Sequence, residues 1–386
     1  MIFLHVLCIA SWYPCAGEPL LGSYFQEQFE ALSRHGLRVT VLALDFRSLR
    51  KPRPWGLPCG TENGLSVYRL SVPLGPLGNG VFDKVIHLAY KYAYQRIISR
   101  EGTLHLIHAH AISAGLMAEA ISKWAKIPYI VTEHSSGTYQ VLQDRAETAR
   151  YRRVYNNSKK IIAVSEGLCS VIADIAQSPV DIRHIPNMVD FGKFRPITAR
   201  RKHFTFVSIG NLIARKGFDI LIAAFSRVNR KFPDTRLNII GGGPEHSSYI
   251  RQCEDLNVGR YVVFPGKLSR DELAEHLPGC HCFVLASRAE PFGVVFAESL
   301  ACGLPVIGTA CDGPKSIINE TNGLIVPVDD TDALAGAMER IYAHFSEYDS
   351  EKIRHDALKL YGTDEVSARI AELYGEVLET EWPGQA

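Results

Sequence analysis

Residues 285–309 read LASRAEPFGVVFAESLACGLPVIGT, and this stretch decides the fold. The apolar run at 282–286 predicts a buried parallel strand, and the polar loop at 287–293 places proline and glycine where a turn requires them. A short helix is expected at 294–302, and the next strand begins at 306–308. The loop therefore follows the carboxyl end of a strand, where open α/β sheets bind ligands.

Two carboxylates of this stretch, Glu290 in the loop and Glu298 in the expected helix, lie eight positions apart. They do not share one helical face, so they are better placed to hold two parts of one ligand than to act as a paired acid and base. Between them, the amides of Gly293, Val294 and Val295 would point out of a helix N-terminus, which is a favourable site for phosphate. This arrangement suits a nucleoside diphosphate-sugar. A loop acid followed by a solvent-facing helix acid would give the same spacing.

The composition is that of a globular α/β protein with two domains. The 386 residues exceed one ordinary hydrophobic core, and 46% are hydrophobic. The net charge of +1 argues against a nucleic-acid partner. Residues 1–192 carry 20 Lys and Arg against 15 Asp and Glu (+5), and the remainder carries 22 against 26 (−4). The first half is therefore the better candidate to meet an anionic surface.

The opening residues 1–14 are apolar but have neither a basic start nor a small-residue cleavage site, and no run reaches the length of a membrane span. They predict the first buried strand of a cytoplasmic protein. The nine cysteines are scattered, and the spacing of Cys280 and Cys282 matches neither a zinc pair nor a redox CxxC. Reduced, mostly buried thiols are expected.

A βαβ start is predicted from a strand at 4–10, an irregular loop at 11–23, a helix at 26–35 and a strand at 38–43. Gly22, in the loop, would let a phosphate or sugar approach the backbone closely. A plain turn glycine is an equally good interpretation.

Two basic segments lie further along the first half. The helix expected at 83–100 is rich in aromatic and basic residues, which suits a lipid headgroup layer. Residues 145–160 could bind anionic lipid or a pyrophosphate-bearing acceptor. For both segments, a solvated helix face gives the same pattern.

A buried strand is expected at 104–108, followed by HAHAISAG and a helix at 112–124. Alternation places His108 and His110 on one face, so a metal pair is an alternative. No nearby Asp, Glu or Cys completes a ligand set, which argues against a metal. We prefer a hydrogen-bonding role for His110 at a sugar or acceptor over an inert core histidine.

The second half repeats the strand–loop–helix pattern from residue 204 on. The strand at 204–209 leads into GNLIARKG at 210–217, where Arg215 and Lys216 near a helix start would cradle phosphate. A later strand ends in GGGPE at 241–245, which exposes bare backbone at a sharp turn.

In this order and spacing, the GxxxxxKG turn, the GGGPE strand end and the E-x7-E element resemble the family 4 retaining glycosyltransferases of GT-B fold. The resemblance extends to Gly22, the HAH of the first half, VSEGL at 164–168 and IPNMVD at 185–190, and so covers nearly the whole chain. It implies two facing Rossmann-like parallel-sheet domains with a cleft between them. We expect an acceptor-side domain at 1–195, a nucleotide-sugar-binding domain at 196–355, and a C-terminal helix at 356–386 that folds back on the first domain.

The resemblance also implies roles for individual residues. Glu298 would bind the ribose hydroxyls, Glu290 a sugar hydroxyl, and Lys216 the diphosphate as negative charge develops there. His110 would lie near the transferred sugar. Further donor-binding residues would be Gly22, Asn211, Arg215, Gly243, Phe292, Gly293, Val294 and Val295. The family uses no metal or other cofactor, and its reaction retains the anomeric configuration.

Three positions depart from the family pattern. Asn211 stands where many members have an arginine that assists Lys216. Met188 replaces a common glycine, and Lys315 stands where an acid is common.

The sequence predicts a retaining hexosyltransferase that moves a sugar from a nucleoside diphosphate donor to a growing, lipid-linked glycan in cell-surface polysaccharide synthesis. It would be cytoplasmic or peripheral to the inner face of the membrane, with an anionic membrane surface as a further partner of the first domain. The alternatives are a nucleotide-sugar epimerase or hydrolase, and a non-catalytic nucleotide-sugar-binding subunit.

Overall fold

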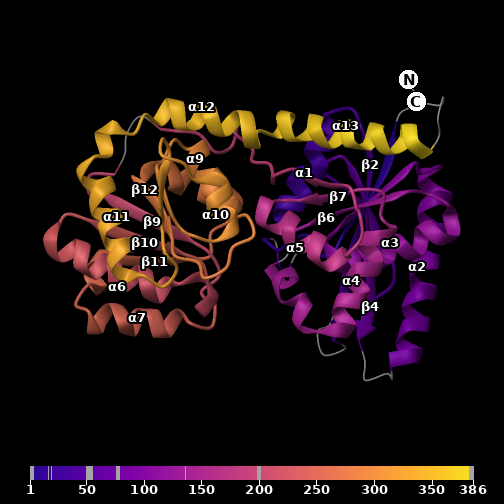
Figure 1. Ribbon diagram of the computed structural model, residues 1–386, viewed down its shortest axis with the longest axis horizontal. Helices are drawn as coiled ribbons and strands as arrows, with labels where there is room; N and C mark the ends of the chain where they lie inside the picture. Colours follow the sequence, from indigo (N-terminus) through magenta and orange to yellow (C-terminus); the bar gives the residue numbers. More distant parts are fainter. Residues whose placement is uncertain are drawn as a thin grey trace. The chain divides into compact units, whose positions relative to one another are not determined.

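The computed structural model describes residues 4–15, 17–18, 20–48, 55–74, 79–134, 136–197 and 201–381. The chain forms two compact units (Figure 1). The first comprises Met1–Ile185 with Asp364–Ala386, and the second comprises Pro186–Thr363. Each is described by itself. Within the described ranges, no helix is both long and apolar enough to cross a membrane.

The first unit is built on an eight-stranded sheet with the strand order β3-β4-β2-β1-β5-β6-β7-β8. Neighbouring strands are parallel except in the β3–β4 hairpin. The strands are β1 (His5–Ala10), β2 (Arg38–Ser48), β3 (Cys59–Glu62), β4 (Leu65–Leu74), β5 (Leu106–His110), β6 (Tyr129–Glu133), β7 (Ile161–Ala163) and β8 (Ile182–His184).

Helices cover both faces of this sheet, because a parallel sheet with apolar strands must be buried on both sides. Thr132 and Val131 of β6 point to opposite faces: Thr132 bonds to His108, whereas Val131 lies beneath Gly115 of α3. The α-helices of the unit are α1 (Ser23–Arg34), α2 (Asn79–Glu101), α3 (Ala111–Ala125), α4 (Arg145–Asn157), α5 (Glu166–Ala176) and α13 (Thr363–Glu381).

The second unit contains a six-stranded, wholly parallel sheet with the order β11-β10-β9-β12-β13-β14. Its strands are β9 (Thr205–Ile209), β10 (Arg236–Ile240), β11 (Val262–Gly266), β12 (Cys282–Leu285), β13 (Val306–Thr309) and β14 (Gly323–Val326). Its α-helices are α6 (Phe218–Lys231), α7 (His246–Asp255), α8 (Arg270–His276), α9 (Val294–Ala301), α10 (Asp312–Ile317), α11 (Thr331–Ala343) and α12 (Ser350–Tyr361).

The observed division falls between Ile185 and Pro186, where the sequence led us to expect a boundary near residue 195. The intervening segment belongs to the second unit because its side chains and carbonyls are used there. Phe194 is fully buried, and Arg354 of α12 donates hydrogen bonds of 2.7 Å to the carbonyls of Phe191 and Phe194. At the other end of the chain, α12 stays with the second unit and α13 belongs to the first.

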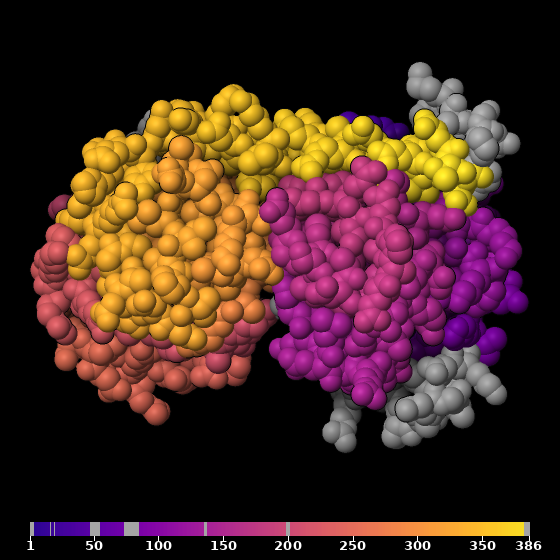
Figure 2. Space-filling model, viewed as in Figure 1, coloured from indigo at the N-terminus to yellow at the C-terminus, as the bar shows by residue number. Residues whose placement is uncertain are grey.

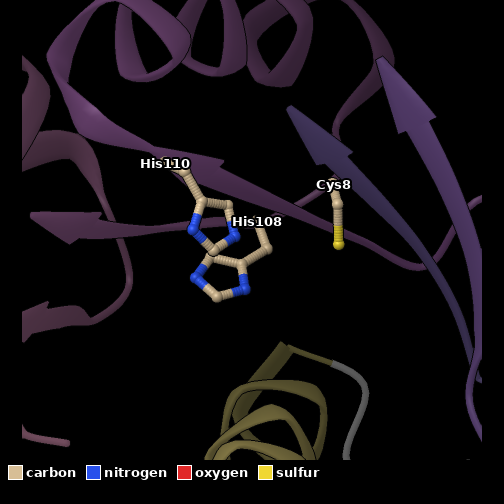
Figure 3. A group of neighbouring side chains, drawn as sticks. All are labelled: Cys8, His108 and His110. Atoms are coloured by element: carbon tan, nitrogen blue, oxygen red, sulfur yellow. The ribbon is translucent and has the colours of Figure 1, made fainter. Parts of the chain in front are cut away.

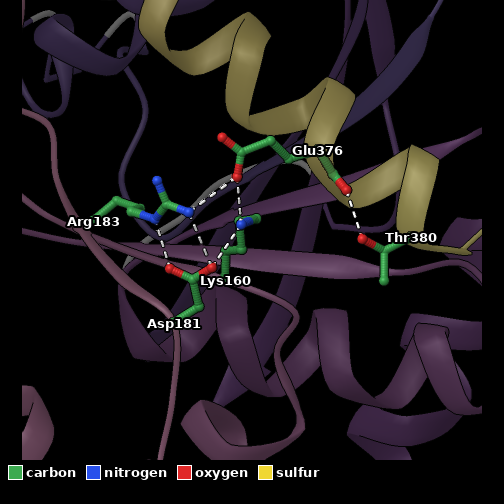
Figure 4. A network of polar contacts seen from close by, with 5 residues as sticks. All are labelled: Lys160, Asp181, Arg183, Glu376 and Thr380. Atoms are coloured by element: carbon green, nitrogen blue, oxygen red, sulfur yellow. Dashed lines mark hydrogen bonds and ion pairs between the residues drawn. The ribbon is translucent and has the colours of Figure 1, made fainter.

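α13 is fastened to the first unit by buried and charged contacts, and it runs along the surface of that unit (Figure 2). The fully buried Tyr374 places its hydroxyl 2.6 Å from Nδ1 of His108. Glu376 accepts hydrogen bonds from Lys160 at 2.6 Å and Arg183 at 3.1 Å, and both cations also bind Asp181 (Figure 4). The network lowers the pKa of the Glu376 carboxyl, chiefly through the hydrogen bond from Lys160.

Tyr374→Phe should lower the free energy of unfolding by about 1–2 kcal/mol, because His108 would keep a buried ring nitrogen without its partner. Chemical denaturation measures this directly. Tyr13→Phe is the matched control, since the buried Tyr13 hydroxyl has no hydrogen-bond partner among the described residues. That variant should be neutral or slightly stabilising. Equal effects of the two substitutions would contradict the role given to the Tyr374 hydroxyl.

Candidate functional site

The second sheet reverses its direction of growth at β9 and β12. From β9 the chain adds β10 and β11 on one side, and then returns to add β12, β13 and β14 on the other. The loops that follow β9 and β12 therefore leave the sheet in opposite directions and open a crevice between them, the usual ligand site of such sheets. The first of these loops carries the predicted GxxxxxKG turn, and the second carries Glu290.

The loop after β9 is held against the loop after β12 by backbone packing. Gly217 has a left-handed φ of 66°, and a Cβ at this position would lie 1.9 Å from the Ala286 carbonyl oxygen. Glycine is therefore required there. Glycine is also required at position 243, because a Cβ there would lie 2.4 Å from the carbonyl oxygen of Leu212. The structural role of Gly243 is thus close packing of two loops, whatever it binds.

Lys216 and Glu290, from these two loops, form an ion pair. Their side chains are only 15% and 9% exposed, so little water screens the two charges. The sequence analysis gave Lys216 the diphosphate and Glu290 a sugar hydroxyl. The ion pair shows that these two side chains lie next to each other in the second unit.

Arg288 fixes the position of this pair, and sequence reasoning missed it. Its amide donates to the Arg215 carbonyl at 2.8 Å, and its guanidinium binds the carbonyl of Ala214. The same guanidinium donates to Asp219 at 2.7 Å and Asp329 at 2.7 Å. These contacts raise the pKa of Arg288, chiefly through the hydrogen bond to Asp219. The amide and side chain of Arg288 thus hold Arg215 and Ala214, the residues that precede Lys216 in the opposite loop.

α9 begins at the crevice with its amides pointing outward. Its N-cap, Gly293, has φ 82° and no side chain to cap the helix, so the amides of Val294 and Val295 are left for a ligand or for water. Phe292, just before, is buried with its ring 5.8 Å from that of Tyr361. Phe292 thus anchors the loop, which leaves only its backbone as a candidate donor contact.

Glu298 lies one turn deeper in α9 and is fully buried. Its carboxylate is paired with Arg270 of α8, a residue that the sequence analysis did not single out. The three residues that depart from the family pattern have the burial typical of their residue types. Asn211 and Lys315 are exposed, and Met188 is buried.

The first sheet reverses at β1 and β5 in the same way, and the predicted residues of the first unit follow those strands. Gly22 caps α1 with φ 70°, and a Cβ there would lie 2.5 Å from the Trp12 carbonyl oxygen. This geometry fits both interpretations of Gly22, a plain turn glycine and a site where a phosphate or sugar approaches the backbone. A tight turn also exposes backbone. Ala111 directly follows His110, the last residue of β5. It has a left-handed φ of 66°, which is an uncommon conformation for alanine.

His110 is fully buried. Its ring packs against Phe25 and Phe29, and its Nδ1 lies 3.2 Å from Nε2 of His134. Within the described part of the chain its Nε2 has no hydrogen-bond partner. Burial lowers the pKa of His110, and the neighbouring His108 and His134 lower it further, so the ring is neutral.

The expectation that no cysteine lies near His108 and His110 was wrong. Parallel pairing sets Cys8 of β1 opposite His108 of β5, and one ligand atom from each of the three residues lies within 4.8 Å of the others (Figure 3). Both ring nitrogens of His108 are, however, already hydrogen-bonded at 2.6 Å, to Tyr374 and Thr132. Burial lowers the pKa of His108 to about 3 and raises that of the Cys8 thiol. Hydrogen bonds therefore account for both ring nitrogens of His108 without a metal.

The comparisons with known proteins identify the class. Residues 190–352 match the family description "Glycosyl transferases group 1", and residues 21–193 match "Glycosyltransferase Family 4". The chain therefore belongs to glycosyltransferase family 4.

Relatives agree with this assignment. The chain is 30% identical over 242 residues to the GDP-mannose-dependent alpha-(1-6)-phosphatidylinositol monomannoside mannosyltransferase of Mycolicibacterium smegmatis, over 58% of this chain and 63% of the relative. It thus spans less than two thirds of that relative's length. Its fold is similar to sucrose-phosphate synthase from Thermosynechococcus elongatus, with a TM-score of 0.79 at 20% identity over 98% of this chain and 100% of that one. Alr3699/HepE of Anabaena, in complex with UDP and glucose, gives 0.73 at 16% identity over 97% and 100%. These structural matches show the fold alone, and the predicted α/β GT-B fold is confirmed.

Gly217→Ala should destabilise the protein by about 2–4 kcal/mol, because a side chain would be forced into a left-handed conformation and against the Ala286 carbonyl. Gly336→Ala is the control: this glycine lies in α11 with open space around its Cβ position, and alanine there should be neutral or stabilising. Urea unfolding of both variants measures the difference. A neutral effect of Gly217→Ala would show that the two loops are not held at this point.

Proposed function

We propose that this protein is a retaining glycosyltransferase that moves a hexose from a nucleoside diphosphate-sugar to a growing, lipid-linked glycan. The observation that carries the proposal is the half-buried Lys216–Glu290 pair beside the outward-pointing amides of α9. A buried cation and helix-terminal amides are suited to a diphosphate, and the neighbouring carboxylate is suited to sugar hydroxyls.

In this proposal, Lys216 exchanges partners when the donor binds. The diphosphate takes the place of Glu290 beside the ammonium group, and Glu290 is released to accept a hydrogen bond from a sugar hydroxyl. Lys216 then stabilises the charge that builds on the departing diphosphate. Glu298 binds the ribose, and the backbone of Asn211 to Arg215 and of Phe292 to Val295 lines the donor.

The bond changes follow from the donor chemistry. The acceptor hydroxyl oxygen bonds to the anomeric carbon on the face from which the diphosphate leaves, so the configuration is retained. The bond between this carbon and the diphosphate oxygen breaks, and the hydroxyl proton passes to the departing phosphate. No metal or other cofactor takes part in this scheme. Gly22 would approach the diphosphate, and the neutral His110 would hydrogen-bond the transferred sugar.

The two alternatives predicted from the sequence have less support. A non-catalytic binding subunit would rest on Asn211, whose side chain is exposed. The presence of Lys216, Glu290, Glu298 and His110 together argues against it. An epimerase or hydrolase would use the same donor, and acceptor-dependent release of the nucleotide distinguishes it from a transferase.

The donor test uses melting temperatures against UDP-, GDP-, ADP- and TDP-sugars. A true donor should raise the melting temperature of the wild type, because it binds the folded state. Glu298→Ala should remove the shift and raise KM. Lys216→Ala should lower mainly kcat, because its charge matters most as the bond breaks. The exposed Glu320 provides the control variant, Glu320→Ala, which should behave like the wild type. Equal, minor effects of both site substitutions would contradict the assignment.

A lipid-linked acceptor is supported by the name of the mannosyltransferase relative, which contains phosphatidylinositol. It also agrees with the α2 surface, which we define as the exposed residues Leu88, Lys91, Tyr92 and Arg96 of α2 with Trp124 of α3. Leu88 is 68% exposed and Tyr92 is 52% exposed. Apolar and basic side chains together suit an anionic bilayer. We propose a location at the cytoplasmic face of such a membrane.

The other basic segment has internal partners instead. Arg150 pairs with Glu147, Arg153 with Glu119, and Lys159 with Glu381. Lys160 is 11% exposed and is bound by two carboxylates. The structure therefore favours a structural role for residues 145–160 over lipid binding.

Sedimentation with anionic vesicles tests the α2 surface. Binding should fall as salt rises, and Lys91→Glu with Arg96→Glu should reduce it several-fold at low salt. Arg150→Glu is a matched charge reversal on α4, outside this surface, and should leave sedimentation unchanged. An absence of binding at low salt would remove the membrane proposal.

A further inference from the structure

Arg270 lies over the buried end of the site described above. It is the first residue of α8, whose N-terminus is fixed by a capping box between Ser269 and Glu272. Its guanidinium contacts the Glu298 carboxylate and lies 5.0 Å from the ring centroid of Phe194. The Arg270 side chain is 17% exposed, whereas Glu298 has no exposed surface. Arg270 is therefore the counter-charge of the buried Glu298 carboxylate.

The position of Arg270 is determined by contacts that do not involve Glu298. The ring of Phe194 beneath it is fully buried, and Arg354 holds the Phe194 carbonyl. Next to Arg270, Asp271 forms an ion pair of 2.8 Å with Lys193. The segment that precedes β9, the start of α8 and the middle of α9 are thus tied together around one guanidinium.

A buried carboxylate needs such a partner to stay ionised. Without it, the low dielectric of the interior would favour the protonated acid, by up to several pKa units for a fully buried group. An ionised carboxylate accepts hydrogen bonds at both oxygens, which matches the two adjacent hydroxyls of a ribose. A protonated acid would offer one donor and would match them poorly.

We infer that Arg270 is a positioning residue for the donor: its guanidinium holds the Glu298 carboxylate ionised and in place for the ribose. The inference rests on the proposed function, because it takes Glu298 as the ribose-binding group. Arg270 itself is required only to touch Glu298, so its effect should pass entirely through that residue.

Few other charged side chains on the elements around Glu298 could replace Arg270 as its counter-charge. α12 presents Arg354, whose guanidinium is already bound to the carbonyls of Phe191, Phe194 and Ala301. α10 carries Asp312 and the exposed Lys315, and β13 (Val306–Thr309) has no titratable side chain. Cys302, the C-cap of α9, donates its amide to the Glu298 carbonyl at 3.1 Å. Lys193 is engaged by Asp271.

The test measures binding of UDP-glucose and GDP-mannose to full-length variants at pH 6.5 and pH 9. Wild-type affinity for the accepted donor should change little between these values. Arg270→Met should bind about tenfold more weakly at pH 6.5, because Glu298 takes up a proton, and should recover most of the loss at pH 9. Arg270→Lys, which keeps a positive charge, should restore much of the binding at pH 6.5.

Two further variants separate this role from a loss of packing. Arg270→Met combined with Glu298→Gln should bind no more weakly than Glu298→Gln alone, and neither should respond to pH. Glu320→Ala, the exposed control substitution used above, should leave donor affinity unchanged. In kinetic assays, Arg270→Met should raise KM more than it lowers kcat.

The outcomes distinguish the inference from the function on which it rests. Equal donor binding by the wild type and Arg270→Met at both pH values would overturn the role of Arg270 alone. A pH-independent loss in Arg270→Met, unrelieved by lysine, would also overturn it and would indicate a packing defect. An absence of binding of any UDP-, GDP-, ADP- or TDP-sugar to the wild type would overturn the proposed function and the role of Arg270 together.

Discussion

The constraint on which the second unit depends is the close approach of two backbones at the carboxyl ends of β9 and β12. Parallel strands that reverse their order at this point send successive loops away from each other. Gly217 brings the loops back together, because a hydrogen atom is all that fits against the Ala286 carbonyl. Next to this contact, Lys216 of one loop pairs with Glu290 of the other.

The charges of the site are arranged in pairs of opposite sign. Lys216 is paired with Glu290, and Arg270 is paired with Glu298. Uncompensated buried charges would cost several kcal/mol each, so each of these buried glutamates needs a cationic partner. The E-x7-E spacing places its two glutamates beside cations of two different elements, Lys216 and Arg270.

The sequence predicted much of the fold because its strands are short apolar runs followed by glycine-rich loops. The elements around 282–309 lie close to their predicted bounds, as β12, α9 and β13 show. Local pattern also identified the candidate loops, since glycine, lysine and glutamate occur at fixed distances within them. It failed where the partner is distant in sequence. Cys8 lies opposite His108 only through strand pairing, and Arg288 and Arg270 act on residues far from them along the chain.

The sequence by itself determined the fold class and the residue types that follow several of the strands. These properties depend on hydrophobic periodicity and turn chemistry, which are local. Only the tertiary structure decided which charges meet, that Glu298 and His110 are buried, and that residues 186–194 belong to the second unit. Such features depend on contacts between segments distant in sequence. Burial in the fold also lowers the local dielectric, which strengthens the interactions between the charges involved.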